Sequence, residues 1–159
     1  MTLNGHFSGE LFQFLEELKQ NNNRDWFQAN KGRYEDDVKK PWQSFILEFG
    51  PKLSEINPNF VADPSPVGGS MFRIYRDVRF AKDKSPYKTA SSAHFRHEVA
   101  KNVHAPGFYL HLEPGNVLAG CGIWRPDNRS LAKIRDAIVE NDKGWKRVIN
   151  GKPFSRTYS

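Results

Sequence analysis

The chain concentrates its positive charge in one short segment, residues 72–89. This segment holds six basic and two acidic residues, so it carries +4 of the chain's formal net charge of +6. Charge that serves solubility is normally spread over a surface with both signs mixed. Guanidinium groups bind phosphate or carboxylate through paired hydrogen bonds, and ammonium groups add point charges. The segment therefore predicts a site for an anionic ligand.

The residues of this segment divide by expected role. We expect the ligand to be bound by Arg73, Arg79, Lys82, Lys84, Tyr87 and Lys88, with Arg76, Asp77 and Asp83 in support. Apolar residues occupy every second position from Phe72 to Phe80 except that of Arg76, a pattern typical of an extended strand, and Arg76 falls on this apolar face. A charge on the apolar face is tolerated only when it is paired. We therefore expect Arg76 to be buried against Asp77, Asp83 or a carboxylate from the N-terminal helices, whereas Tyr87 is either a packed ring or a ligand-facing hydroxyl.

The kind of anion depends on the shape of the segment. Arg73 and Arg79 would lie about 20 Å apart on a fully extended strand, at ~3.3 Å per residue. That distance suits a nucleic acid backbone, whereas a small phosphate compound requires the chain to bend. Further candidates for the same basic surface are Arg24, Lys31 and Arg33, with Trp26 or Tyr34 stacking on a base or sugar.

Three functions fit this pattern. The first is a binding domain for a phosphate-bearing ligand. The second is an enzyme acting on a phosphoryl or carboxylate compound, in which the same arginines stabilise developing negative charge. The enzyme needs a general base or a metal, and the sequence shows neither at a recognisable spacing. The third is an interaction module in which the ion pairs are architectural.

The other reactive residue types predict no metal site and no cofactor. His94 and His97 fall on opposite faces of an expected strand, and neither they nor His104 and His111 match the spacing of a zinc site. Cys121, the only cysteine, lies between two glycines and is expected to be a small buried residue.

Composition predicts a cytoplasmic protein without a membrane partner. A lone cysteine cannot form a disulfide within the chain and fits a reducing compartment. The first residues lack the basic and apolar regions of a signal peptide, and no stretch approaches the roughly 20 apolar residues of a membrane span. The sequence does not indicate which oligomeric state the protein adopts.

The elements that must hold the charged segment follow from hydrophobic spacing. Helical spacing runs over residues 8–20 and again over 24–56, where Pro41 should kink or split the helix. A loop at 57–69 precedes four expected strands, at 71–80, 92–98, 107–113 and 117–124, and further helices follow over 128–138 and 143–150. This order predicts an α+β fold: N-terminal helices packed on a mainly antiparallel sheet and followed by C-terminal helices, in one domain over 1–159.

Two blocks of sequence carry a resemblance to a known family. The pattern R-x-x-R-D-x-R-F runs from Arg73 to Phe80, and D-K-x-x-Y follows from Asp83 to Tyr87. The pattern L-x-x-N-N-x-R-x-W-F-x-x-x-K-x-x-Y-E runs from Leu18 to Glu35. Later matches are Gly107 to Leu110, Gly120 with Gly122, and Ile134 with Arg135.

The chain as a whole resembles the bacterial proteins of unknown function called DUF2461. The resemblance implies no established activity. It also implies that family members usually continue for several tens of residues beyond the position of Ser159, so the chain is either a fragment or a short member.

Overall fold

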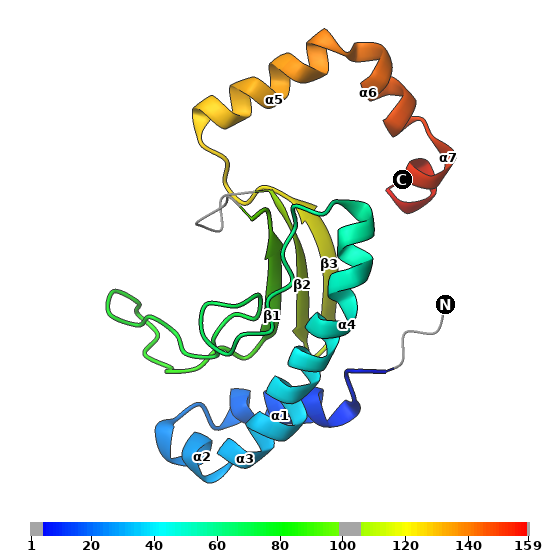
Figure 1. Ribbon diagram of the computed structural model, residues 1–159. Coiled ribbons are helices and arrows are strands. Elements are labelled where there is room, and N and C mark those ends of the chain that lie inside the picture. The colour runs from blue at the N-terminus through cyan, green and yellow to red at the C-terminus, as the bar shows by residue number, and fades with distance from the viewer. Residues whose placement is uncertain (1–4, 99–105, 159) are drawn as a thin grey trace. The chain divides into compact units, whose positions relative to one another are not determined.

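The computed structural model describes residues 5–98 and 106–158. The chain divides into two compact units, Met1–Trp124 and Arg125–Ser159, and each is described by itself. Helices come first, then a three-stranded antiparallel sheet, then helices again (Figure 1). This order confirms the predicted α+β fold, while a single domain over the whole chain stays a prediction.

Asparagines separate the first two helices. Helix α1 (Gly9–Gln20) ends at Asn21, and α2 (Arg24–Ala29) begins after Asn23. The Asn23 side chain accepts a hydrogen bond of 2.9 Å from the backbone N–H of Trp26. This bond satisfies one of the donors that every helix start leaves without an intrahelical partner.

The second helical region changes helix type just before Pro41 and is not split there. The three residues of α3 (Lys31–Arg33) continue into the π-helix η1 (Tyr34–Lys39), and α4 (Lys40–Ile56) begins one residue before Pro41. A proline ring clashes with the carbonyl four residues earlier. Here the backbone N–H of Lys40 already bonds five residues back, to Glu35. The wider turn lets the helix pass Pro41 without a break.

The sheet contains β1 (Ser91–Arg96), β2 (Gly107–Glu113) and β3 (Asn116–Gly122), in that order and antiparallel throughout. A two-residue turn joins β2 to β3, with Glu113 paired to Asn116. Gly115 takes a φ of 76° in this turn, a conformation that glycine adopts without steric cost. These strands confirm three of the four expected ones to within a few residues.

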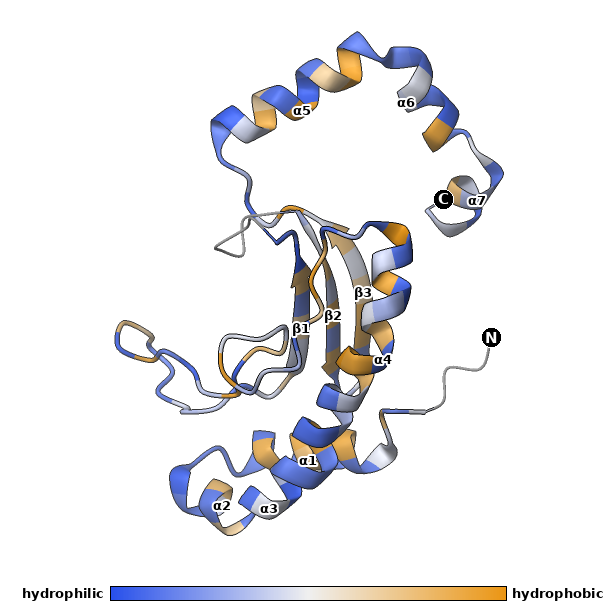
Figure 2. Cartoon of the chain, in the orientation of Figure 1, coloured by the Kyte–Doolittle hydropathy of each residue, from blue (hydrophilic) through white to orange (hydrophobic). Residues whose placement is uncertain are grey.

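The N-terminal helices and one face of β1 and β2 form the hydrophobic core. Ala93, Phe95 and Leu112 supply the sheet side, and the Phe95 ring lies 4.9 Å from that of Phe49 on α4. Apolar and polar residues alternate along α4, as an amphipathic helix requires (Figure 2). The helices contribute Leu11, Phe14, Leu15, Leu18, Phe27, Tyr34, Val38, Trp42, Ile46 and Leu53.

The predicted strand at 71–80 is wrong. Met71 makes one bridge to Ala93, and the chain then leaves the sheet and pairs with itself, Tyr75 opposite Tyr87. Polar side chains bond to nearby backbone groups beyond this point, as Asp77 does with the N–H of Arg79. Such local bonds compete with a strand ladder. The alternation of burial nevertheless holds from 72 to 79, with even positions less exposed than odd ones.

The prediction of a buried Cys121 is also wrong. Cys121 is exposed, as are all seven residues of β3. The strand pattern did not reveal this exposure, because the core side chains of the sheet come from β1 and β2, whereas β3 lies beyond β2 and contributes none.

The second unit contains α5 (Asn128–Glu140), α6 (Asp142–Ile149) and α7 (Lys152–Thr157). The Asp127 side chain caps α5 by accepting a hydrogen bond of 2.7 Å from the Ser130 N–H. None of the residues described in these three helices is buried. Among the described residues of both units, no helix combines the length and apolar character needed to cross a membrane.

Candidate functional site

The structure separates the predicted anion site into a loop and a base. The backbone N–H of Arg76 donates to the Pro86 carbonyl at 2.9 Å, and that of Lys88 donates to the Ile74 carbonyl at 2.8 Å. These bonds close residues 77–85 into a projecting loop, which we call the signature loop (Figure 1). Arg79, Lys82 and Lys84 belong to this loop, whereas Arg73, Tyr87 and Lys88 lie at its base.

Most charges of the signature loop are engaged within the loop. Arg79 donates two hydrogen bonds to the Asp77 carboxylate, at 2.9 and 2.7 Å. This pairing lowers the pKa of Asp77 and raises the pKa of Arg79. The ammonium of Lys84 donates to the backbone carbonyl of Val78 at 3.0 Å. Lys82 is exposed, and within the described residues its side chain makes no hydrogen bond or ion pair.

Arg76 is paired as predicted but is not buried. Its guanidinium bonds to the Asp83 carboxylate and, at 3.1 Å, to the Ser85 carbonyl. The Arg76 side chain is 29% exposed and that of Asp83 is 63% exposed. Hydrogen bonds from Ser85, and then the one from Arg76, hold the pKa of Asp83 well below its usual range. Arg76 therefore fastens the loop to itself.

Of the two roles expected for Tyr87, the structure shows the packed ring. It is 3% exposed and stacks on Phe27 with ring centroids 4.1 Å apart. The neighbouring Lys88 donates to the Arg73 carbonyl at 2.9 Å, and its ammonium lies 5.4 Å from the centroid of the Phe72 ring. Burial, and then the Arg73 charge, lowers the pKa of Lys88. The Tyr87 ring therefore belongs to the core, and Lys88 uses one of its three ammonium donors to hold the base of the loop.

Asn22 fastens the base of the loop to the N-terminal helices. Its side-chain amide donates to the Tyr87 carbonyl at 3.0 Å and accepts from the Tyr87 N–H at 3.1 Å. This pair of bonds imitates a strand partner and positions Tyr87 over Phe27. In the sequence, Asn22 appears only within the family pattern from Leu18 to Glu35, which did not reveal this contact.

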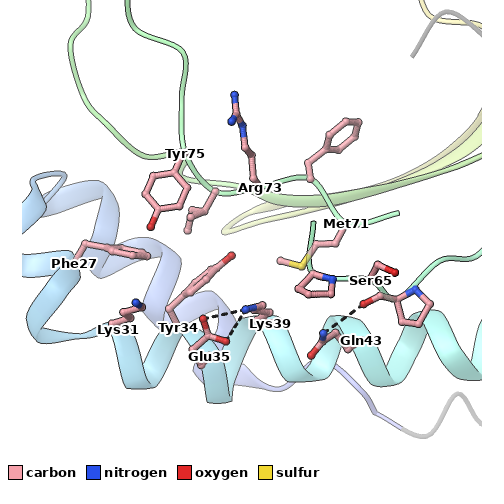
Figure 3. Close-up of a pocket in the computed structure, with 14 residues that line it drawn as sticks. Phe27, Lys31, Tyr34, Glu35, Lys39, Gln43, Ser65, Met71, Arg73 and Tyr75 are labelled. Atoms are coloured by element: carbon pink, nitrogen blue, oxygen red, sulfur yellow. Dashed lines mark hydrogen bonds and ion pairs between the residues drawn. The ribbon is translucent and has the colours of Figure 1, made fainter. Parts of the chain in front are cut away.

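A cavity of about 230 Å³ lies between these helices and the residues that lead into the loop. Its lining comes from 27–43, from the 64–66 turn and from 71–75 (Figure 3). Among the predicted site residues, Arg73 alone lines it. Lys31 and Tyr34, named as outlying candidates, also line it, whereas Arg33 instead donates to Glu17 at 2.6 Å.

Sequence reasoning missed Glu35, Lys39 and Tyr75 as cavity residues. A signal existed, because Lys31, Glu35, Lys39 and Gln43 recur every four residues and all line the cavity. Residues four apart drift around a regular α-helix. The π-helical turn between Tyr34 and Lys39 holds more residues per turn, which offsets that drift and keeps the polar stripe on one side.

The cavity combines three cations with one carboxylate. Lys39 donates to both oxygens of Glu35, at 2.8 and 3.1 Å. Within the described residues, the side chains of Lys31 and Arg73 make no hydrogen bond or ion pair, and both are exposed. Burial, and then the charges of Glu35 and Tyr75, raises the pKa of Tyr34 well above its usual range. The Tyr34 hydroxyl is therefore a hydrogen-bond donor at neutral pH.

Histidine chemistry has less support in the structure. Over residues 5–98 and 106–158, no group of three histidine, cysteine, aspartate or glutamate side chains is placed to hold a metal ion. His94 is half-buried, and burial followed by the charge of Arg96 lowers its pKa. His111 bonds along β2 to Tyr109 at 3.0 Å and to Glu113 at 3.2 Å. His104 lies outside the described residues.

The first unit is thus an α+β domain with a helix-covered antiparallel sheet and a cation-lined cavity. A family model described as "Conserved hypothetical protein (DUF2461)" matches residues 10–159. The chain belongs to this DUF2461 family, which confirms the resemblance seen in the sequence. Both sequence blocks that carried the resemblance contribute to the cavity wall, through Lys31 to Glu35 and through Arg73. No curated protein and no solved structure matches the chain.

Proposed function

We propose that the first unit binds a small phosphate-bearing compound in the cavity lined by Lys31, Lys39 and Arg73. One observation carries this proposal: cations from two segments about forty residues apart in the sequence line a single cavity that contains only one carboxylate among its described residues. Three cations and one carboxylate leave a formal charge of +2 to be balanced. An anionic ligand would balance it.

The hydrogen-bonding groups of the cavity suit a phosphate. Lys31 and Arg73 carry donors that no described residue uses, and Lys39 can exchange one Glu35 oxygen for a ligand oxygen. The protonated Tyr34 hydroxyl adds a neutral donor. Hydrogen bonds from the lysine and arginine cations to a phosphate would be charge-assisted, and such bonds are about twice as strong as neutral ones.

The dimensions favour a small ligand over a polymer in this cavity. A volume of about 230 Å³ lies below the roughly 300–1,000 Å³ of most ligand sites, and Phe27, Phe72 and Tyr75 are among the residues that line it. In Figure 3 the Arg73 guanidinium points away from the helix that carries Lys39. Binding through Arg73 therefore includes a rotation of this exposed side chain toward the ligand.

The enzyme alternative lacks an observation of its own. Glu35 is the one carboxylate among the described lining residues, and both of its oxygens accept from Lys39. Tyr34 keeps its proton, because its pKa is raised. A general base needs a free acceptor within reach of the reacting proton. We therefore propose binding without catalysis.

Calorimetry and thermal unfolding with inorganic phosphate and a nucleoside monophosphate test the proposal. A ligand that binds the folded state raises the melting temperature with its concentration. The variant Lys39→Gln should weaken binding by about tenfold, equivalent to ~1.4 kcal/mol, because it removes one charge-assisted contact. Arg73→Gln should weaken it similarly.

The matched control is Lys40→Gln. Lys40 follows Lys39 directly, forms an equivalent ion pair four residues back with Asp36, and does not line the cavity. It should leave the affinity unchanged. Equal losses in Lys39→Gln and Lys40→Gln, or the absence of any thermal shift at low salt, would contradict the proposal.

A further inference from the structure

The signature loop presents one aromatic ring almost completely to solvent. Phe80 is 96% exposed, the highest exposure among the large hydrophobic residues that the structure describes. The loop projects away from the sheet in Figure 1, and Figure 2 shows the projecting segment as largely hydrophilic with an apolar tip. Full exposure of a phenylalanine forgoes the ~1.5–3 kcal/mol that burial of such a side chain contributes.

Hydrogen bonds and ion pairs hold the part of the loop that carries Phe80. Arg79 is held by Asp77, Lys84 by the Val78 carbonyl, and Arg76 by Asp83. The backbone N–H of Ala81 also donates to the Val78 carbonyl, at 3.4 Å. These bonds lie on both sides of Phe80 and fix the turn that carries it. The ring is therefore presented on an ordered support.

The tip of the loop is also positively charged. Four cations lie within four residues of Phe80, and two of them, Arg76 at the base of the loop and Arg79 within it, are paired with the carboxylates of Asp83 and Asp77. Lys82 has no partner within the described residues, and Lys84 bonds only to backbone carbonyls and so keeps its full charge. A formal charge of +2 thus lies within four residues of Phe80. The charge of a suitable partner is negative.

One face of the Phe80 ring already has a neighbour. The guanidinium carbon of Arg79 lies 5.9 Å from the ring centroid, within the range of a cation–π contact. The carboxylate of Asp77 holds this guanidinium in place through two hydrogen bonds. The opposite face of the ring is open to a second flat group.

We propose that the signature loop binds single-stranded nucleic acid, with one base stacked on Phe80 and the flanking phosphates on Lys82 and Lys84. An aromatic ring beside cations that follow the backbone is the arrangement by which proteins bind single strands without sequence readout. An anionic membrane is less well matched, because binding at a membrane surface scales with buried apolar area and the tip offers one ring. This site is separate from the phosphate cavity and does not rest on the function proposed there.

Fluorescence anisotropy with a labelled twelve-nucleotide oligothymidine at low salt tests this proposal on the full chain. Phe80→Ala should weaken binding at least fivefold, because stacking contributes ~1–3 kcal/mol per base. Phe80→Trp should retain binding, since it keeps a stacking surface. Val67→Ala changes another highly exposed apolar residue, 89% exposed and outside the signature loop, and should have no effect.

The salt dependence tests the role of the lysines. The slope of log affinity against log salt should fall by about 0.7 in Lys82→Gln, the value for one phosphate contact on a single strand. An unchanged slope would overturn the assignment of Lys82. Lys39→Gln should leave oligonucleotide binding intact, and a loss there would show that the cavity and the loop form a single site, which would overturn the separate site.

Two further outcomes would overturn the proposal as a whole. One is equal affinity of the wild type and Phe80→Ala for the oligonucleotide. The other is sedimentation with phosphatidylserine vesicles, abolished in Phe80→Ala, by a wild type that does not bind the oligonucleotide. That second result would assign the ring to a lipid surface. Because Phe80 is exposed, its variants should fold normally, which unchanged thermal unfolding verifies.

Discussion

The cavity and the signature loop use the same kinds of residue in opposite ways. At the cavity, Lys31 and Arg73 come from separate segments and keep their donors free of described partners. In the loop and at its base, Arg79 and Arg76 come from one segment, and their guanidinium groups donate to carboxylates of the loop itself. Charge that converges from distant segments leaves room for a ligand, whereas charge that is crowded in one segment can first satisfy its own neighbours.

The aromatic residues show the same contrast. Phe27 is 1% exposed and Phe80 is 96% exposed, although both belong to the blocks that identify the family. Phe27 stacks on Tyr87 and supports the cavity wall, while Phe80 contacts Arg79 alone among the described rings and cations. One ring contributes to the fold, and the other is available to a partner.

The largest expected effect tests this contrast directly. Phe27→Ala should lower the free energy of unfolding by about 3–5 kcal/mol, the usual cost of removing a buried ring. Phe80→Ala should change it by less than about 0.5 kcal/mol, as at other exposed sites. Denaturant unfolding of the two variants measures both. Comparable losses would mean that the loop packs against something in solution and that the contrast is mistaken.

A smaller effect should appear at the connection between the two regions. Asn22→Ala leaves both the N–H and the carbonyl of Tyr87 without a side-chain partner, and should cost about 1–2 kcal/mol. Hydrogen exchange should then accelerate at residues 74–88. Asn21→Ala, next in sequence but bonded only to the end of its own helix, is the control and should leave that exchange unchanged. If Asn22→Ala behaves like this control, the loop is held without the amide.

The smallest effect concerns pH and the loop alone. The pKa of Asp83 is held low by Ser85 and Arg76 in the folded state. A carboxyl with a lowered folded pKa contributes stability above its unfolded pKa, near 3.9, and loses it as the pH falls further. Wild type and Asp83→Asn should therefore differ in melting temperature at pH 6, and the difference should shrink steadily as the pH falls below about 4 toward the lowered folded pKa. A difference that stays constant between about pH 4 and pH 2 would show that the pairing does not depend on ionisation.

Local sequence was enough to predict most of the elements. Helical spacing located α1 and the start of α2, and the helix type changes close to Pro41, where a kink or split was expected. Strands β2 and β3 were located to within a few residues. These features depend on residues within a few positions of one another, so the sequence contains the information that decides them.

The strand predicted at 71–80 shows where that information ends. Alternation correctly separated the more exposed side chains from the less exposed ones between Phe72 and Arg79. It did not reveal that this segment pairs with Pro86 to Lys88 instead of with the sheet. The choice of partner depends on the competing hydrogen bonds of distant residues, among them the amide of Asn22.

The sequence alone determined the family, the α+β order and the segment in which charge accumulates. Only the tertiary structure decided which of those charges are satisfied. The pairs Asp77–Arg79 and Arg76–Asp83 form because a turn brings near neighbours together. Lys31, Lys39 and Arg73 line one cavity because helices fold against a segment some forty residues away. Whether a charge is free to bind a ligand depends on its surroundings in space, which its sequence neighbours only partly supply.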